Sequence, residues 1–243
     1  MDMSVVIPEK IYGDRSGFLK LQKRLNAILG DLHVEVKLSA VEKQWVKVSV
    51  SGEDEEVAVS LLKREFGQIP IKLSSIKVGD VLRGRLIDVG RVGYSLYVDV
   101  GVLSPKPKDA LVPLYWLKAE FYDEPLRLMA DRMGWVDGLP VEVEIKSVEF
   151  GTREIEAVFS TDQIERFKEW RSDGLDKLFI TGTILENVEK ALLETGHHRD
   201  VRRIEELGLM ETLVVLKKGT NAPGIIKEIG PYVREALIGA IKF

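Results

Sequence analysis

The chain has 243 residues, of which 45% are hydrophobic and 30% charged, values typical of a soluble globular protein with roughly one to three domains. It contains no cysteine, which excludes disulfides, zinc–thiolate sites and thiol catalysis. The net charge of −4 argues against a general polyanion-binding protein, because such proteins are usually basic overall. No apolar run reaches membrane-spanning length and the first residues lack a signal-peptide pattern, so we expect a cytoplasmic protein with no membrane partner.

Residues 1–75 alternate between strand-like and helix-like patterns. We expect strands at residues 3–7, 33–38, 45–50 and 69–73, and helices at 16–30 and 53–67. Ser16 is a candidate helix N-cap, and Gly30 and Gly67 follow the last apolar positions of the two helices. The acidic run 53–56 fits the positive end of a helix better than it fits a metal site. The predicted order, βαββαβ, is the ferredoxin-like arrangement.

Trp45 lies on a predicted strand whose two faces differ. Val46, Val48 and Val50 share the face that suits the helix-covered side of the sheet, so Trp45 and Lys47 point to the open side. An aromatic ring on that side can stack on an RNA base, as in RNA-recognition motifs, but the paired aromatic pattern of those motifs is absent. The sequence therefore favours packing of Trp45 against a neighbouring domain.

Residues 76–160 hold five further strand-like segments, with glycines at the bends. They are VGDVLRGRLIDVG (78–90), YSLYVDVG (94–101), DALVPLYWL (109–117), LPVEVEIKSVE (139–149) and REIEAVFS (153–160). A helix-like segment, 123–133, separates the third from the fourth, and its stripe of Leu126, Met129, Ala130 and Met133 indicates a plug beneath a barrel. Five antiparallel strands with a helix after the third predict an OB-fold, a small barrel used mostly on nucleic acids.

The same region resembles the RNA-binding domain repeated in bacterial ribosomal protein S-one. Two Gly-containing pairs begin the first strand of that family, and they are matched here by Gly79, Asp80, Gly84 and Arg85. A Gly-aromatic-small-aromatic-Val-Asp stretch follows, matched by Gly93, Tyr94, Tyr97, Val98 and Asp99. The third strand is matched by Leu111 to Tyr115. The resemblance covers about a third of the chain and implies that Tyr94 and Tyr97 stack on RNA bases. The chain departs from that family at Pro113, where histidine is common, and in a longer 103–109 loop.

Seven residues of this region form a predicted nucleic-acid-binding set. Single-stranded nucleic acid needs aromatic rings beside cations, because rings stack on any base and cations meet phosphates. The set comprises Arg83, Arg85, Arg91, Tyr94, Tyr97, Lys106 and Lys108. In the alternative interpretation, the tyrosines fill the mouth of the barrel and the arginines pair with Glu142, Glu144 or Asp88.

Residues 161–174 are expected to form a connector helix packed on the barrel. Ser160 and Gln163 form a capping-box pattern at its start, and the apolar residues that follow recur every three positions. Residues 175–243 give a second pattern consistent with a βαββαβ ferredoxin-like domain. We expect strands at 178–184, 211–216 and 236–241, helices at 186–195 and 222–233, and a segment, 200–207, that fits either state.

Two polar segments of this last part are weaker candidate sites. Lys217, Lys218, Gly219 and Thr220 lie between a strand and a helix, where lysines and backbone amides could bind an anion such as phosphate. The segment is not a Walker motif, however, and a plain strand-to-helix turn is the favoured interpretation. The adjacent pair His197-His198 points in two directions with no third ligand in range, so we predict no metal site.

No catalytic motif is present, and we expect neither an enzyme nor a cofactor. The phrases IEELGL (204–209) and VVLKKGTNAPGIIKEIG (214–230), with the central barrel, resemble an uncharacterised archaeal protein family, which implies a setting in archaeal information processing. We therefore expect a non-catalytic RNA-binding or ribonucleoprotein-associated protein, with RNA or a ribonucleoprotein or transcription complex as partner. The alternative is a protein–protein adaptor in archaeal transcription or translation. A phosphate-dependent enzyme using residues 217–224 is a third, weaker hypothesis.

Overall fold

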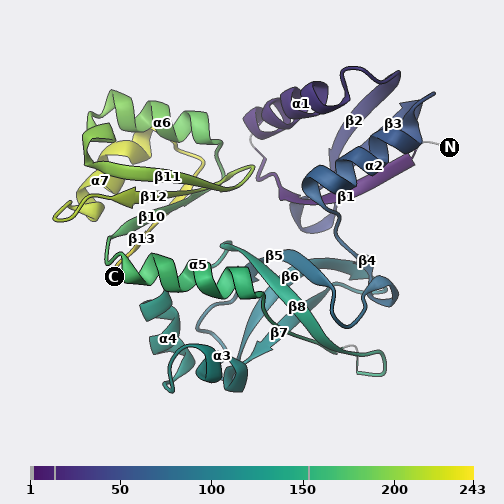
Figure 1. Cartoon of the computed structure of the whole chain (residues 1–243). Coiled ribbons are helices and arrows are strands. Elements are labelled where there is room, and N and C mark those ends of the chain that lie inside the picture. The colour runs from purple at the N-terminus through teal and green to yellow at the C-terminus, as the bar shows by residue number, and fades with distance from the viewer. Residues whose placement is uncertain (1–2, 14, 153) are drawn as a thin grey trace.

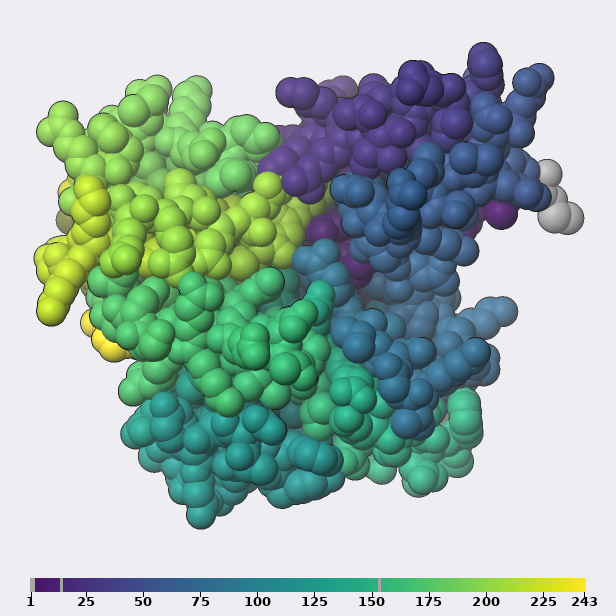
Figure 2. Space-filling view, in the orientation of Figure 1, coloured from purple at the N-terminus to yellow at the C-terminus, as the bar shows by residue number. Residues whose placement is uncertain are grey.

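The computed structural model describes residues 3–13, 15–152 and 154–243. The chain forms three α+β parts in sequence order: an N-terminal sheet with helices, a closed barrel, and a C-terminal sheet with helices (Figure 1). The two end parts lie next to each other on one side of the barrel, and Figure 2 shows all three in contact. None of the described helices is long and apolar enough to span a membrane.

The N-terminal part is a three-stranded antiparallel sheet with two helices. Its elements are β1 (Met3–Lys10), α1 (Arg15–Leu29), β2 (Val34–Ala40), β3 (Trp45–Gly52) and α2 (Glu55–Phe66), and the strand order is β1-β3-β2. Val46, Val48 and Val50 pack with buried residues of both helices, such as Leu25 and Leu62, as the strand pattern predicted. The other face of β3, which carries Trp45, is therefore free to meet the barrel.

A short strand lies within the predicted range 69–73, but it does not join this sheet. The amide of Ile69 bonds to the carbonyl of Val6 on β1, with a distance of 2.9 Å. Pro70 follows and has no amide to donate, and Ile71 turns the chain with a φ of 49°. The short strand β4 (Ile71–Lys72) then pairs in parallel with a strand of the barrel. The first part thus ends on the barrel instead of completing its own sheet.

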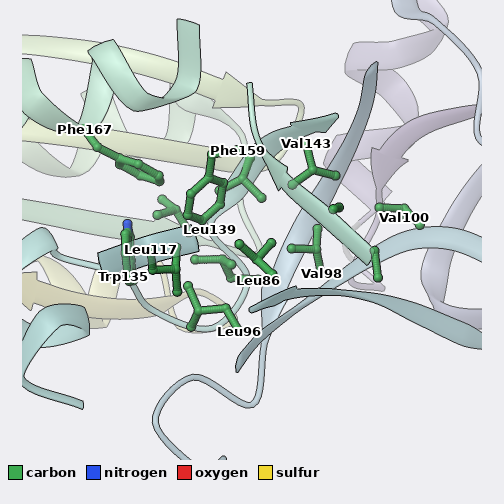
Figure 3. Close-up of a cluster of buried hydrophobic side chains, with 14 of the residues drawn as sticks. Leu86, Leu96, Val98, Val100, Leu117, Trp135, Leu139, Val143, Phe159 and Phe167 are labelled. Carbon is green, nitrogen blue, oxygen red and sulfur yellow. The ribbon is translucent and has the colours of Figure 1, made fainter. Parts of the chain in front are cut away.

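The central part is a closed five-stranded barrel. Its strands are β5 (Val81–Ile87), β6 (Ser95–Ser104), β7 (Lys108–Pro113), β8 (Pro140–Glu149) and β9 (Glu154–Phe159). The ladder runs β5–β6–β7–β9–β8 and returns from β8 to β5, with β7–β9 parallel and every other pair antiparallel. Leu86, Val98 and Val143 are among the apolar side chains that point inward from successive strands and fill the interior (Figure 3). The predicted start of the last strand, residue 153, lies outside the described residues.

Two short helices, α3 (Leu114–Glu120) and α4 (Leu126–Met133), connect β7 to β8. The sequence predicted α4, and its stripe Leu126, Met129, Ala130 and Met133 is buried in the barrel core. It does not predict α3, because residues 109–117 have a strand-like pattern. Pro113 in extended conformation ends β7 and is the N-cap of α3, after which residues of good helix propensity follow. The change of element at Pro113 matters because it places two aromatic residues on a helix.

Helix α5 (Thr161–Ser172) belongs to the body of the barrel. The amide of Gln163 donates to the Ser160 hydroxyl at 3.2 Å, which confirms the predicted N-cap. Phe167 and Trp170 are buried in the same cluster as the barrel interior, and the Phe167 ring lies 5.2 Å from that of Phe159. The helix therefore covers one end of the barrel and leads into the third part.

The C-terminal part is a four-stranded antiparallel sheet with two helices. Its elements are β10 (Lys177–Thr181), α6 (Leu185–Glu194), β11 (Val201–Gly208), β12 (Glu211–Leu216), α7 (Ala222–Ile229) and β13 (Leu237–Ile241), in the strand order β11-β12-β10-β13. The ambiguous segment 200–207 forms the edge strand β11, because it finds a partner in β12. One face of the sheet packs on α6 and α7, and the other contributes Phe179 and Leu213 to the barrel cluster.

The turn between β11 and β12 links the C-terminal part to the N-terminal part. Leu209 and Met210 are buried at 1% and 0% exposure in the N-terminal core. A side chain on Gly17 of α1 would meet the Met210 sulfur at 2.6 Å, so glycine at this position gives the Met210 side chain its present room. The two end parts are therefore interlocked above the barrel and not merely adjacent.

Candidate nucleic-acid interface

A group of aromatic residues lies outside the barrel near the start of β6 and the end of β7, which pair with each other there. Strand alternation directs Leu96 and Val98 inward and Tyr97 outward, and Tyr94 precedes the strand with 67% of its surface exposed. The hydroxyls of Tyr94 and Tyr97 are 3.2 Å apart, and this hydrogen bond raises the pKa of Tyr94. Tyr94 is thus exposed, Tyr97 is half-buried, and their hydroxyls are adjacent. The alternative in which they fill the barrel mouth does not hold.

Two more aromatic residues extend this surface. Tyr115 and Trp116 lie at the start of α3, with ring centroids 5.7 Å apart, and both donate to the Glu156 carboxylate on β9. The position is fixed because the amide of Leu114 bonds to the Tyr94 carbonyl at 2.9 Å. Pairing across the sheet places Leu111 beside both Tyr97 and Glu156. We call Tyr94, Tyr97, Tyr115 and Trp116 the aromatic face.

Acidic groups accompany the aromatic face. Glu156 accepts from Tyr115 and raises its pKa through that hydrogen bond. Glu154 lies next on the outward side of β9 and is exposed, and its charge also acts on Tyr94. Arg91, in the preceding loop, forms an exposed ion pair with Asp88. The face therefore offers rings and carboxylates, with little positive charge of its own.

The other predicted cations do not join the aromatic face. Arg83 is half-buried on the side of the barrel that meets the end parts, where it donates to the carbonyl of Leu207 at 3.2 Å. Lys106 is exposed and Lys108 half-buried at the start of β7, opposite the far end of β6 from Tyr97. The predicted set is thus divided among three regions of the surface.

The prediction that Arg85 lies on an open binding face is wrong. Its side chain is 1% exposed and donates to both carboxylate oxygens of Glu211, with donor–acceptor distances of 3.2 and 3.3 Å. Glu9 of the N-terminal part lies 3.6 Å away and accepts from the amide of Leu209 at 2.7 Å. Tyr12 donates to the same Glu211 at 2.9 Å. The guanidinium thus joins one acid from each end part to the barrel.

A second set of buried charges lies beside the first. Lys10 donates to Asp99 of β6 at 2.8 Å, and Lys43 bonds to Asp109 of β7 at 2.7 Å. The Lys10 ammonium also lies 4.4 Å from the centre of the fully buried Trp45 ring. Trp45 thus packs against the barrel, as the sequence favoured. We call Glu9, Lys10, Arg85, Asp99 and Glu211 the ionic junction.

Burial sets the protonation behaviour of the ionic junction. It is the largest cause of the raised pKa of Glu9, to which Glu211 adds while Arg85 opposes it. It also lowers the pKa of Lys10 against the pull of Asp99. For Arg85, burial acts to lower the pKa, but the charges of Glu211 and Glu9 outweigh it and raise the pKa. Arg85 is therefore a permanently charged centre between two carboxylates.

The weaker candidate segments form local structure. In the 217–220 segment, the Thr220 amide and hydroxyl bond to the carbonyl of Lys217, and the Lys217 ammonium donates to the Arg199 carbonyl. That geometry is the plain turn favoured from the sequence, while Lys218 is exposed. His197 bonds to Asp200 and Glu228, and no group of three potential metal ligands occurs among residues 3–13, 15–152 and 154–243. An anion site at this turn stays a prediction.

These features define a three-part α+β protein with a closed barrel at its centre and an aromatic surface on the barrel's open side. Sequence profiles of one family match all three parts, as DUF2110 N-terminal domain over residues 4–72, DUF2110 central domain over 76–171 and DUF2110 C-terminal domain over 175–241. The chain belongs to the DUF2110 family. No curated protein sequence matches it.

Three of the solved structures that resemble this chain show distant likeness. An uncharacterized protein from Methanocaldococcus jannaschii has 13% identity and a TM-score of 0.25, with 35% of this chain and 95% of that chain covered. A protein of vaccinia virus (Wisconsin strain) has 20% identity and a TM-score of 0.24, covering 35% and 89%. The a/eIF2alpha–aDim2p–rRNA complex from Pyrococcus horikoshii OT3 has 12% identity and a TM-score of 0.27, covering 50% and 64%. These TM-scores are too low to inform function.

Proposed function

We propose that this protein is a non-catalytic RNA-binding protein that holds single-stranded RNA on the aromatic face of its barrel. The observation that carries the proposal is the gathering of four aromatic residues on one side of the barrel, with Tyr94 and Tyr115 exposed and Tyr97 and Trp116 half-buried beside them. Bases of any sequence can stack on such rings, and each stacked base contributes about 1–3 kcal/mol when measured by alanine substitution. Four adjacent rings are enough to hold a short strand.

The charges on the face determine how this RNA would bind. Phosphate contacts make binding weaken steeply with salt, in proportion to the number of phosphates neutralised. Because Glu154 and Glu156 accompany the rings and Arg91 is paired with Asp88, few phosphates are neutralised here. Binding should therefore depend mainly on stacking and only weakly on salt.

Within this proposal the barrel is an OB-fold of the ribosomal protein S-one type, which the strand ladder and the helical connection between β7 and β8 support. The end parts are proposed to be ferredoxin-like. The βαββαβ order and antiparallel sheet of the C-terminal part support this, whereas β4 departs from it in the N-terminal part. The proposed domains are 1–75, 76–160 with the connector 161–174, and 175–243, in a cytoplasmic archaeal setting.

Intrinsic fluorescence tests the proposal directly. Of the four tryptophans in the sequence, Trp45, Trp135 and Trp170 are buried, so Trp116 is the one that a ligand on the aromatic face can reach. Single-stranded oligo(A), oligo(C) and oligo(U) of about nine nucleotides fall within the site size of one such barrel. We expect at least one of them to quench Trp116, and Tyr97→Ala to weaken its binding about tenfold. Tyr232→Ala, at a tyrosine of the C-terminal part that is 55% exposed, is the matched control and should leave binding unchanged.

Three outcomes would overturn the proposal. They are no quenching by any of the three oligonucleotides, equal losses for Tyr97→Ala and Tyr232→Ala, or binding that disappears with modest salt. The last outcome would locate the interaction at phosphates and away from the rings.

A second candidate function is a protein–protein adaptor whose barrel binds a basic segment of a partner. The carboxylates of Glu154 and Glu156 beside four rings favour it, because lysine and arginine side chains bind both acids and aromatic faces. A nuclease-treated pull-down tests it. A defined basic partner that is retained by the native protein and lost with Tyr97→Ala would support this function over RNA binding.

A further inference from the structure

We infer that a hollow beside Trp116 is a pocket for one amino-bearing nucleobase, adenine or cytosine, of a strand that lies on the aromatic face. The inference rests on the proposed function and adds base selectivity to it. The hollow has a volume of about 190 Å³ and lies where α3, strands β8 and β9 and the first turn of α5 meet. It is distinct from the exposed rings, because it is recessed between elements.

The hollow is continuous with the aromatic face through Trp116. The indole nitrogen of Trp116 donates to Glu156 at 3.3 Å, on the side that carries Tyr115. The same residue also lines the hollow, together with Val158, which lies two residues after Glu156 on the outward side of β9. A base placed in the hollow would therefore lie beside a strand stacked on the face.

The walls suit a flat aromatic ring. Leu117, Phe121 and Val158 provide apolar surface, and Trp116 provides a ring for contact. Ligand pockets for drug-sized molecules usually have about 300–1,000 Å³. A hollow of about 190 Å³ is too small for a whole nucleotide and matches a single base, with its sugar and phosphate left outside.

The rim supplies a specific hydrogen-bonding pattern. Glu120 and Glu144 contribute carboxylates, which only accept, and Lys146 contributes an ammonium, which only donates. Lys146 lies 2.6 Å from Glu144, so acceptor and donor stand side by side on β8. Adenine and cytosine carry an exocyclic amino group next to a ring nitrogen that accepts, which is the complement of this pair. Uracil presents a carbonyl at the position of the amino group, so an acceptor would meet a carboxylate that only accepts.

The difference in affinity between oligonucleotides of different bases tests this pocket separately from the aromatic face, because stacking on the face accepts any base. We expect the native protein to bind oligo(A) or oligo(C) about tenfold more tightly than oligo(U). Quenching of Trp116 fluorescence measures the binding. Val158→Phe fills the hollow and should bring binding of the preferred strand down to the oligo(U) level while leaving oligo(U) itself unchanged. Thr161→Tyr, at an exposed residue on the rim, blocks the mouth from a second side and should have the same effect.

Controls separate this inference from the proposed function. Val57→Phe, on α2 and 51% exposed, adds the same ring elsewhere and should change neither affinity nor preference. Thermal midpoints of all variants verify folding, and Thr161→Tyr keeps the test decisive if Val158→Phe is destabilised. If all three strands bind equally, or if both filling variants keep the preference, the pocket is refuted and the aromatic face stands. If no strand binds, the proposed function fails first.

Discussion

Tyr97 and Asp99 lie two residues apart on β6 and both point out of the barrel, yet they reach opposite environments. Tyr97 belongs to the aromatic face and is accessible, whereas Asp99 is 2% exposed and bonds to Lys10 of the N-terminal part. On β5, Arg85 is likewise directed outward and is fully covered. The barrel thus has two outer sides. One is closed by the end parts through buried ions, and one is left open with aromatic rings.

The two sides differ in what holds their charges. In the ionic junction each carboxylate is compensated by a cation from another part of the chain, because a buried charge without a partner costs several kcal/mol. On the aromatic face Glu154 and Glu156 keep contact with water and need no cation. Charge therefore links the three parts on one side, whereas on the other side the proposed ligand would meet carboxylates that, among the described residues, have no cation bound to them from another part.

The largest effect is expected from breaking the ionic junction at its centre. Arg85→Met leaves Glu211 and Glu9 buried without their guanidinium, so the free energy of unfolding should fall by about 3–5 kcal/mol. Urea denaturation measures it. Arg91→Met, which removes an exposed ion pair beside the aromatic face, should cost no more than about 1 kcal/mol. Equal losses for the two variants would contradict the distinction between the two sides.

Removing the interlock between the end parts should come next. Met210→Ala leaves a cavity in the N-terminal core, although the residue belongs to the C-terminal part, and should cost about 3 kcal/mol. The loss should appear as one cooperative transition if the three parts unfold together. Leu193→Ala, at a side chain that is 65% exposed, is the control and should stay within about 0.5 kcal/mol. A separate transition in which the N-terminal part unfolds before the other two would show that its stability does not depend on them, and would contradict the interlock.

Periodicity and turn residues were enough to predict most elements. Alternation along β3, the stripe of α4 and the cap at Ser160 each reflect local rules that the rest of the chain does not override. The sequence does not reveal α3, because a proline such as Pro113 fits an irregular strand position as well as the end of a strand. Strand β4 leaves the N-terminal sheet after Pro70. The sequence shows this proline, but it does not show that a strand of the barrel is available to pair with β4 instead.

The candidate site was predicted in part for a different reason. A period of two tells which side chains leave the barrel, and it placed Tyr97 and Arg85 outward correctly. It cannot tell what covers the outside, since that depends on contacts between residues more than a hundred positions apart, such as Arg85 with Glu211. One signal was available: Leu209 and Met210 are apolar residues in a tight turn, which indicates insertion into another part of the molecule.

On the open side, Glu156→Gln tests how charge acts on the ligand. The amide can still accept from Tyr115 and Trp116, so the rings keep their places while one negative charge is lost. We expect RNA affinity to rise about two- to threefold at low salt, an effect of about 0.5 kcal/mol that fades as salt screens it. Glu65→Gln, at an exposed acid on α2, is the control and should change little. Loss of affinity for a basic partner would instead support the adaptor function.

The smallest effect concerns the pH dependence of the closed side, through Glu9→Gln. Because burial raises the pKa of Glu9 above its ordinary value of 4.5, the folded state binds this proton more tightly than the unfolded chain does. Its contribution to stability is therefore complete below the ordinary value and is lost as the pH rises through the folded pKa. The native protein should gain stability relative to the Gln variant as the pH falls from neutral towards 4.5, which urea midpoints at paired pH values measure. A difference that stays constant over this range would mean that Arg85 holds Glu9 ionised throughout.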